Sequence, residues 1–272
     1  MSSDFVVGFM AAAAVAFAAW RLRALDTGGA ISSWVAGGII FSLGGLRPST
    51  ALLAFFISGS LLSSLPEHRR SGPLLLREEL AGGYARNWKQ VGANGFVPFA
   101  AIIAGRLIPS LEAVFLHAFY GSIAAACADS WGTEVGTRFG KRVRNIMTGH
   151  ELTPGLSGGI SFRGIAGSLG GSALIALAAA LPFTKSVTPG KAWAILMGGF
   201  LGAIADSIFG ATLQAKFQRS GTKEILETLP PPKSGIRPAR LIAGYKQIRN
   251  NSVNLAASAI GALIVVLILD FR

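Results

Sequence analysis

Eight stretches of apolar residues divide this sequence, and they constrain its fold more than any other feature. They cover residues 5–20, 30–45, 49–65, 96–108, 111–128, 165–183, 192–213 and 253–271. Most contain roughly 16 to 20 residues, about the length that an α-helix needs to cross a bilayer. The fourth stretch is shorter and carries Pro98 and Arg106, so its helix is expected to start earlier, with a broken or tilted helix as the alternative. The pattern predicts an all-α fold, a polytopic transmembrane bundle of about eight helices.

The overall composition agrees with a membrane protein and excludes other classes. Of the 272 residues, 51% are hydrophobic, only 14% are charged, and 35 are glycines. An ordinary soluble domain carries about 25% charged residues. The single cysteine, Cys127, cannot form an internal disulfide and is expected to be a small buried residue. The three histidines have no zinc-binding spacing.

The positive charge of the chain lies between the apolar stretches. The formal net charge is +12, but the basic residues form no patch interleaved with aromatic side chains, so nucleic acid is not an expected partner. If the stretches cross a bilayer in alternate directions, 20 of the 25 lysines and arginines fall in one set of loops. Because cytoplasmic loops are enriched in Lys and Arg, both termini are predicted outside and three long loops in the cytoplasm.

These three long loops differ in character. Residues 66–94 are amphipathic, so this segment is predicted to lie along the membrane interface. Residues 138–163 form a basic, glycine-rich loop. Residues 215–247, which include Pro230, Pro231 and Pro232, are expected to form an exposed connection of mixed helix and coil.

Two aspartates stand where apolar stretches end. Asp129 belongs to the sequence ADSWGTEVG, residues 128–136, and Asp206 to ADSIFGATLQ, residues 205–214, 77 residues later. A charged side chain within the membrane costs at least ~2.5 kcal/mol on insertion scales, so such residues usually have a function. The matching contexts indicate an internal repeat of Asp-bearing helices and one shared site.

Each aspartate continues a helical stripe of small residues. The residues four and eight positions before the two aspartates are Gly121, Ala125, Gly198 and Gly202. Small residues let helices approach closely, so one interpretation is helix packing, with each carboxylate neutralised by an arginine or a helix-end amide. The alternative is a cation between the carboxylates, because Mg²⁺ accepts one or two carboxylates together with phosphate oxygens. The metal site is the favoured interpretation, with Asp129, Asp206 and Asn254 as predicted ligands.

Asparagines lie at the start of two predicted helices, on the same membrane face as the aspartates. Asn87, Asn250 and Asn251 are expected to cap helices, since asparagine is a preferred N-cap residue. Asn94 and Asn254 lie deeper, where an amide without hydrogen bonds is unfavourable. Contact with a ligand or metal is therefore favoured over capping for these two residues.

The loop before the sixth stretch is rich in glycine and serine. Its sequence SGGIS, residues 157–161, leads into a predicted helix, where exposed backbone N–H groups and the helix dipole favour an anion. A flexible turn is the alternative. Lys89, Lys141 and Arg163 could balance phosphate charge, although basic residues at such positions also serve as topology determinants. No Walker A or dinucleotide-binding motif is present.

The order and spacing of these motifs resemble a known membrane family. The resemblance rests on NWKQV with ANG (residues 87–95), ADSWGTE (128–134), SGGIS (157–161), ADS with GAT (205–212) and NN with VN (250–254). The family includes the plant phytyl-phosphate kinase of vitamin E synthesis. A more distant similarity links the chain to CTP-dependent dolichol and phytol kinases and to CDP-lipid synthases.

The motifs are unevenly distributed along the chain. They span roughly residues 81–272, whereas residues 1–65 carry none of them. We expect a single integral membrane domain, residues 1–272, in which residues 1–65 form N-terminal helices and the resemblance makes residues 81–272 the catalytic bundle.

The resemblance implies a kinase that transfers a phosphoryl group from a nucleoside triphosphate, with CTP favoured, to an isoprenyl (phytyl-like) monophosphate in the lipid bilayer. Mg²⁺ would be the cofactor, and the site would face the cytoplasm, or the stroma of a plastid. Catalytic roles are assigned to Asp129, Asp206 and Glu134. The residues assigned to nucleotide or phosphate are Lys89, Asn94, Thr133, Lys141, Ser157, Gly158, Gly159, Ser161, Arg163 and Asn254.

Two other functions stay open at this level. A cytidylyltransferase would attack the α-phosphate of CTP and release pyrophosphate, whereas a kinase leaves a nucleoside diphosphate. A membrane transporter would also carry paired motifs and intramembrane carboxylates. A transport site is expected near the middle of the membrane, whereas the polar residues of this chain are predicted at one face.

Overall fold

The computed structural model describes residues 3–65, 85–140, 142–180, 187–229 and 238–270. Within these ranges the chain forms eight α-helices, and each one covers most or all of one predicted apolar stretch. They are α1 (Ser3–Arg21), α2 (Thr27–Gly44), α3 (Leu46–Ser64), α5 (Trp88–Leu107), α6 (Glu112–Phe139), α7 (Phe162–Ala180), α8 (Pro189–Thr212) and α9 (Asn250–Asp270). A short 3-10 helix, η1 (Pro109–Leu111), precedes α6. The predicted all-α membrane fold is confirmed.

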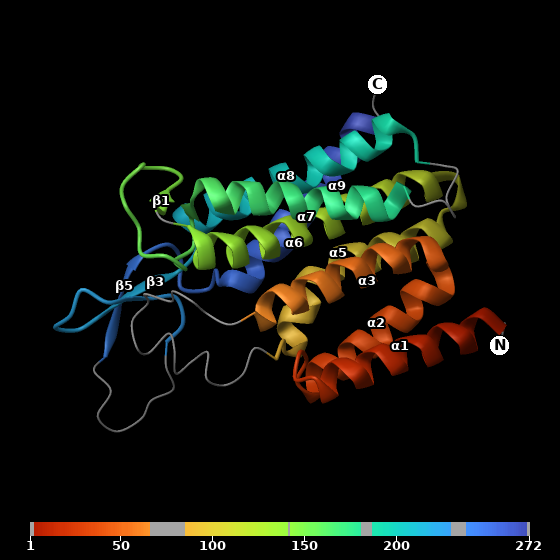
Figure 1. Ribbon diagram of the computed structural model, residues 1–272, viewed down its shortest axis with the longest axis horizontal. Coiled ribbons are helices and arrows are strands. Elements are labelled where there is room, and N and C mark those ends of the chain that lie inside the picture. The colour runs from red at the N-terminus through yellow and green to blue at the C-terminus, as the bar shows by residue number, and fades with distance from the viewer. Residues whose placement is uncertain (1–2, 66–84, 141, 181–186, 230–237, 271–272) are drawn as a thin grey trace.

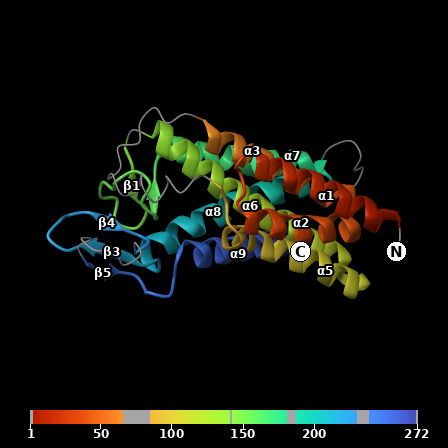
Figure 2. The ribbon, with the colours of Figure 1, turned by 90° about the horizontal axis from the view of Figure 1, so that it is seen from below.

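The helices lie side by side, and the chain reverses direction between them (Figure 1). Both chain ends lie at one end of the bundle and the strands lie at the other, as Figure 2 also shows. The end with the strands, where α6 and α8 finish and α5, α7 and α9 begin, is called the motif end. This alternation agrees with the order of loops expected from the sequence.

Six helical segments in the described ranges are long and apolar enough to cross a membrane. They are α2, α3, η1 together with α6, α7, α8 and α9. Helix α1 is apolar but shorter over Phe5–Arg21, and α5, which carries Lys89 and Arg106, falls outside this set. The bundle is therefore a multi-pass integral membrane structure.

Helix α6 forms the centre of the bundle. It packs against α3, α5, α7, α8 and α9, and every residue from Phe119 to Ala128 is buried. Its side chains share one apolar core with Ile175 of α7 and Ile195 of α8. Cys127 is fully buried and free, as the sequence predicts.

The predicted stripes of small residues bring α6, α8 and α9 into close contact. A Cβ atom on Gly202 of α8 would lie only 2.5 Å from the Cβ of Ala125 in α6, and one on Gly261 of α9 would lie 2.6 Å from the same atom. Side chains at these glycines would force the helices apart. Since Asp129 and Asp206 follow one turn further along their stripes, the close packing directs both aspartates into one region.

Helix α6 continues eleven residues beyond the predicted stretch, to Phe139. Its last three turns are polar, and two of their side chains form hydrogen bonds within the helix. Arg138 Nε donates to Glu134 Oε2 at 3.2 Å, and Thr137 Oγ1 donates to the Thr133 carbonyl at 2.7 Å. Asp129 therefore lies inside a helix, whereas the apolar pattern places it at a helix end.

Helix α5 is one continuous helix, and it begins before the apolar stretch as expected. Asn87 accepts from the backbone N–H groups of Lys89 and Gln90, and the Gln90 side chain accepts from the backbone N–H of Asn87. This reciprocal capping box stabilises the first turn. Pro98 is accommodated within the helix, so the broken-helix alternative is not observed.

Two of the connections at the motif end contain short strands: the one between α6 and α7 and the one between α8 and α9. Strand β1 (Arg144–Asn145) pairs antiparallel with β2 (Gly159–Ile160). Strand β3 (Lys216–Arg219) lies between β4 (Ile225–Leu226) and β5 (Ala239–Ala243) in an antiparallel sheet.

The prediction of helix and coil in residues 215–247 is wrong for the described part of that segment, because the sheet has its own small core of Ala215, Phe217 and Leu226. Three buried side chains spread over twelve residues give no periodic signal in the sequence. Residues 66–84, which are most of the predicted interfacial segment, and Pro230, Pro231 and Pro232 lie outside the described residues.

Candidate functional site

The motif end of the bundle brings the two aspartates together. Asp129 of α6 and Asp206 of α8 are half-buried, and they lie close enough for the Asp129 carboxylate to repel that of Asp206. Neither aspartate forms an ion pair with any other described residue. Since like charges in a medium of low dielectric constant repel strongly, this pair is stable as two carboxylates only if something positive lies near it.

Two asparagines adjoin the aspartates. In one orientation of its amide, Asn254 of α9 donates from Nδ2 to Asn94 Oδ1 of α5 at 3.3 Å. In the other orientation, Nδ2 donates to Asp206 Oδ2 at 3.2 Å and to the Asn250 carbonyl at 2.9 Å. Four different helices thus contribute one residue each to the aspartate cluster, which consists of Asp129, Asp206, Asn94 and Asn254.

A second polar group, here called the Glu227 group, lies beside the cluster. Glu227 accepts hydrogen bonds from Ser157 N at 2.7 Å, from Ser157 Oγ at 2.8 Å and from Gln214 Nε2 at 3.0 Å. Lys216 Nζ donates to the Ser157 carbonyl at 2.9 Å. Glu227 is also near enough to repel Asp206. Ser157, in the loop that the sequence assigns to an anion, is therefore bonded to the Glu227 carboxyl group of the same chain.

Burial controls the ionisation of the Glu227 group. It raises the pKa of Glu227, although the hydrogen bonds from Ser157 and Gln214 and the charge of Lys216 oppose the shift. Burial also lowers the pKa of Lys216, and the Glu227 charge opposes that change. The hydrogen bonds of this group thus only partly offset the loss of solvation.

The oxygen atoms in this region fit a hard cation. Gln214 Oε1 is buried and accepts no hydrogen bond from any described residue, and the aspartate cluster adds two carboxylates and two amide oxygens. No group of three or more His, Cys, Asp or Glu in the described ranges could hold a metal by itself. Mg²⁺ needs no such group, because it binds through one or two carboxylates and completes its shell with water and phosphate oxygens.

The structure does not bring Glu134 into the aspartate cluster. Its Oε2 atom lies 3.1 Å from Arg138 Nη2, and its Oε1 atom accepts from Ser63 Oγ of α3 at 2.7 Å. Arg138 also donates to the carbonyls of Ser63 and Leu65. Glu134 and Arg138 therefore fasten α3 to α6, and the predicted catalytic role of Glu134 gains no support from its surroundings.

Lys89 and Arg163, two of the predicted phosphate-binding cations, make their described contacts outside the aspartate cluster. Lys89 is exposed, with Nζ 5.6 Å from the centre of the Trp88 ring. Arg163 is exposed and donates from Nη1 to the Phe139 carbonyl at 2.7 Å. Thr133 is exposed on α6, and Lys141 lies outside the described residues. Phosphate binding by these four residues stays a prediction.

The glycines and serines of the 157–161 loop have clear packing roles. Gly158 has φ +84°, and a Cβ atom there would lie 2.5 Å from Ala211 Cα. A Cβ atom on Gly159 would lie 2.7 Å from Val143 Cγ1, and Ser161 Oγ accepts from Gly164 N at 3.1 Å in the first turn of α7. The loop thus lies directly against α8, within two turns of Asp206. Contact with phosphate stays a prediction for these residues.

Sequence reasoning missed Glu227 and Lys216, and it included Gln214 only as the last residue of the motif at 205–214. All three belong to the segment that follows α8. The detectable signal is weak: Gln214 and Lys216 lie within ten residues of Asp206, and Glu227 follows an apolar pair, Ile225 and Leu226. Their proximity depends on the β3–β4 hairpin folding back toward the loop that contains Ser157.

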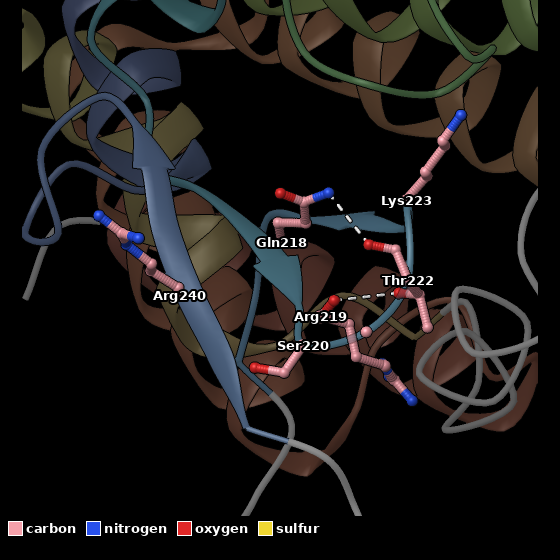
Figure 3. A pocket seen from close by; sticks show the side chains of 7 residues that line it. Gln218, Arg219, Ser220, Thr222, Lys223 and Arg240 are labelled. Carbon is pink, nitrogen blue, oxygen red and sulfur yellow. Dashed lines mark hydrogen bonds between the residues drawn. The ribbon is translucent and has the colours of Figure 1, made fainter.

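A separate pocket lies on the surface over the β3–β4 turn (Figure 3). Its lining is polar and basic, and comprises Gln218, Arg219, Ser220, Gly221, Thr222, Lys223 and Arg240. Gln218 Nε2 donates to the Thr222 carbonyl at 3.0 Å, and Thr222 Oγ1 donates to the Arg219 carbonyl at 3.1 Å. None of the predicted site residues lines this pocket.

The fold and the site together define a polytopic helical membrane protein with an acidic, oxygen-rich site at one end of its bundle. The chain belongs to the family described as integral membrane protein DUF92, whose model matches residues 10–262. The predicted family membership is confirmed. The match begins within α1 and includes α2 and α3, so the family likeness extends beyond residues 81–272, where the motifs lie.

Three relatives show how widely the family occurs. Protein PGR of Arabidopsis thaliana is 26% identical over 264 residues, which cover 89% of this chain and 88% of that protein. An uncharacterised membrane protein of Methanocaldococcus jannaschii is 29% identical over 255 residues, covering 91% and 87%. An uncharacterised membrane protein of Synechocystis is 26% identical over 187 residues, covering 68% and 70%. No solved structure matches this chain.

Proposed function

We propose that the protein is a Mg²⁺-dependent kinase that transfers the terminal phosphoryl group of a nucleoside triphosphate, with CTP favoured, to an isoprenyl monophosphate. The observation that carries this proposal is the meeting of Asp129 and Asp206, from two helices, in a region with an excess of oxygen atoms. Phosphoryl transfer depends on charge neutralisation and positioning, for which paired carboxylates that hold a metal are suited.

Three residues of the aspartate cluster have a direct role in this proposal. Asp129 and Asp206 would hold Mg²⁺, which when bound would neutralise charge on the phosphate oxygens. Asn254, whose amide donates to Asp206 in one orientation and to Asn94 in the other, would orient the Asp206 carboxylate. Lys216 has a defined place beside the Glu227 group, and it would attract the triphosphate to this end of the bundle.

The reaction itself needs no covalent intermediate and no general base. An oxygen of the acceptor monophosphate is already ionised near neutral pH and would attack the γ-phosphorus. A new P–O bond forms, the bond between the γ-phosphorus and the β–γ bridging oxygen breaks, and the nucleoside diphosphate leaves. The lipid product is the isoprenyl diphosphate.

The test is a screen of purified protein with several nucleoside triphosphates and isoprenyl monophosphates, with and without Mg²⁺. We expect a nucleoside diphosphate and a lipid diphosphate, and no product after chelation of Mg²⁺. Release of pyrophosphate would replace the kinase with a cytidylyltransferase. Absence of turnover with every nucleotide, together with solute uptake by reconstituted liposomes, would favour a transporter.

The proposal also requires the motif end to face the compartment that contains nucleoside triphosphates. Starting from Cys127→Ala, a cysteine at the exposed Ser220 of the motif end should react with a membrane-impermeant thiol reagent only after the membrane is opened. A cysteine at the exposed Ser110, at the opposite end, should react in intact cells. The reverse pattern would place the site away from its nucleotide and contradict the proposal.

A further inference from the structure

A largely apolar cavity lies between α1, α2, α3 and α5, the helices that carry few or none of the motifs. Its walls are mainly small or aliphatic side chains, such as Ala12 of α1, Ala36 of α2 and Leu52 of α3. Along α2 the wall runs from Ser33 to Phe41. At 1.5 Å per residue, this part of α2 corresponds to ~12 Å, the scale of a hydrocarbon chain rather than of a head group alone.

Polar groups gather at the motif end of this cavity. Arg86, Gln90 and Asn94 line it there, on and just before the first turns of α5. The backbone of Arg86 is held on both sides, since its N–H donates to the Ala24 carbonyl at 2.9 Å and its carbonyl accepts from Asp26 N at 3.2 Å. The position of Arg86 is therefore fixed by the α1–α2 connection.

The guanidinium group of Arg86 has room and charge for an anion. It lies over the Phe55 ring at 5.6 Å and makes no hydrogen bond to any described residue. Gly59 of α3 leaves the space for it, because a Cβ atom there would lie 2.9 Å from Arg86 Nη2. Burial lowers the pKa of Arg86, and the Glu134 charge, which is shared with Arg138, only partly opposes this. An additional anion would offset this loss of solvation.

The polar end of the cavity leads directly to the aspartate cluster. Asn94 lines the cavity and also meets Asn254, whose amide reaches Asp206 in its second orientation. An anionic group beside Arg86 and Asn94 would thus lie next to the residues assigned to the metal. Asn94 therefore belongs both to the lining of the apolar cavity and to the aspartate cluster.

We propose that this cavity holds the hydrocarbon chain of a single-chain isoprenyl monophosphate, with the phosphate at Arg86 and Asn94; this assignment rests on the proposed kinase function. Transfer of a chain from the bilayer to an apolar cavity brings little hydrophobic gain, because lipid tails are equally apolar. Selectivity must therefore come from the charge at Arg86 and from the shape of the walls. The α1–α3 helices then form the acceptor site, although they lack the motifs.

The first experiment locates the chain without any nucleotide. The purified full-length protein is labelled with a C20 isoprenyl monophosphate that carries a photoreactive diazirine near the end of its chain, and the modified residues are identified by mass spectrometry. We expect labelling on α1, α2 or α3 that unlabelled isoprenyl monophosphate removes. Specific labelling confined to α6–α9, or no specific labelling, would overturn the proposal.

Two adjacent residues of α2 provide a matched pair for the cavity wall. Ala36 lines the cavity, whereas Val35 is exposed on the outside of the bundle. Ala36→Phe should reduce specific labelling roughly tenfold by filling the cavity, and Val35→Phe should leave it unchanged. Equal effects of the two substitutions would contradict a chain-binding role for this cavity.

The head-group assignment is tested at Arg86 by comparing charged and uncharged lipids. Arg86→Gln should weaken binding of the isoprenyl monophosphate roughly tenfold, Arg86→Lys should weaken it less, and neither should change binding of the corresponding alcohol. A damaged fold would weaken both lipids equally, and that result would overturn the head-group assignment. Equal competition by a two-chain phosphatidic acid would identify a site for bulk lipid and would also overturn it.

These outcomes separate the lipid site from the kinase function. Specific labelling of α1–α3 without turnover of any nucleotide would keep the lipid site and remove the proposed function. Turnover combined with labelling elsewhere would keep the kinase and remove this assignment.

Discussion

Helix α6 carries two acidic side chains less than two turns apart, and the rest of the protein surrounds them in opposite ways. Glu134 is bonded to Arg138 and Ser63, and Arg86 lies within electrostatic range of it. Asp129 has no ion pair among the described residues and lies near a second carboxylate, Asp206. The comparison shows that a carboxylate within a bundle can serve packing or chemistry, and that its partners decide which.

The largest expected effect separates these two carboxylates by activity. Asp206→Asn and Asp129→Asn should each reduce turnover by ~100-fold or more. This loss is larger than the one that usually follows when a residue hydrogen-bonded to a metal ligand is removed. Glu134→Gln should change turnover far less, because its carboxylate bonds to Arg138 and Ser63. The measurement is initial rate at limiting Mg²⁺. Near-normal activity in either Asp variant would mean that the residue does not hold the metal.

The next effect tests how the 157–161 loop is held beside Asp206. Gly158→Ala combines a positive φ with a contact of 2.5 Å to Ala211 Cα, so we expect a loss of about 3 kcal/mol in the free energy of unfolding. Gly149→Ala is the matched control, because Gly149 also has positive φ, +71°, but nothing lies within 4 Å of its Cβ position. It should lose only about 1 kcal/mol. Equal losses in thermal unfolding would show that contact with α8 is unimportant.

A smaller effect tests the packing role of Glu134. Glu134→Gln removes the charged partner of Arg138 while the carbonyls of Ser63 and Leu65 remain, so we expect a loss of about 2 kcal/mol in stability. Thr133→Ala is the control on the same helix, because the Thr133 side chain is exposed and should change stability by at most about 0.5 kcal/mol. If Glu134→Gln abolished turnover but left thermal stability unchanged, Glu134 would belong with the catalytic residues.

The smallest effect concerns the ionisation of Glu227. Burial raises its pKa in the folded protein, so the folded state binds its proton more tightly than the unfolded state does. The resulting stability is complete below the ordinary pKa of 4.5 and is lost as the pH rises through the raised folded value. Relative to Glu227→Gln, the melting temperature of the wild-type protein should fall over this range. If the difference in melting temperature between the two proteins did not change with pH, ionisation of Glu227 would have no effect on the stability of the folded protein.

The sequence by itself determined the number of helices and their alternation. Apolar runs of membrane-spanning length suffice for this, because a backbone in lipid must satisfy its hydrogen bonds within a helix. The small residues before Asp129 and Asp206 also predicted which faces pack closely, and the motifs predicted the family. These features are local or periodic, so each can be recognised along the chain without knowledge of distant contacts.

Only the tertiary structure decided which polar residues meet. It gave Glu134 the partners Arg138 and Ser63, which Asp129 lacks. It also brought Glu227 against the 157–161 loop, which the sequence assigns to phosphate. It also formed an apolar cavity between α5 and the helices without motifs, α1 to α3, and positioned Arg86 at its polar end. The physical reason is that the burial and the hydrogen bonding of a carboxylate depend on residues far away in the sequence. Ser63 bonds to Glu134 from 71 residues away and Ser157 to Glu227 from 70, and no local pattern encodes such partners.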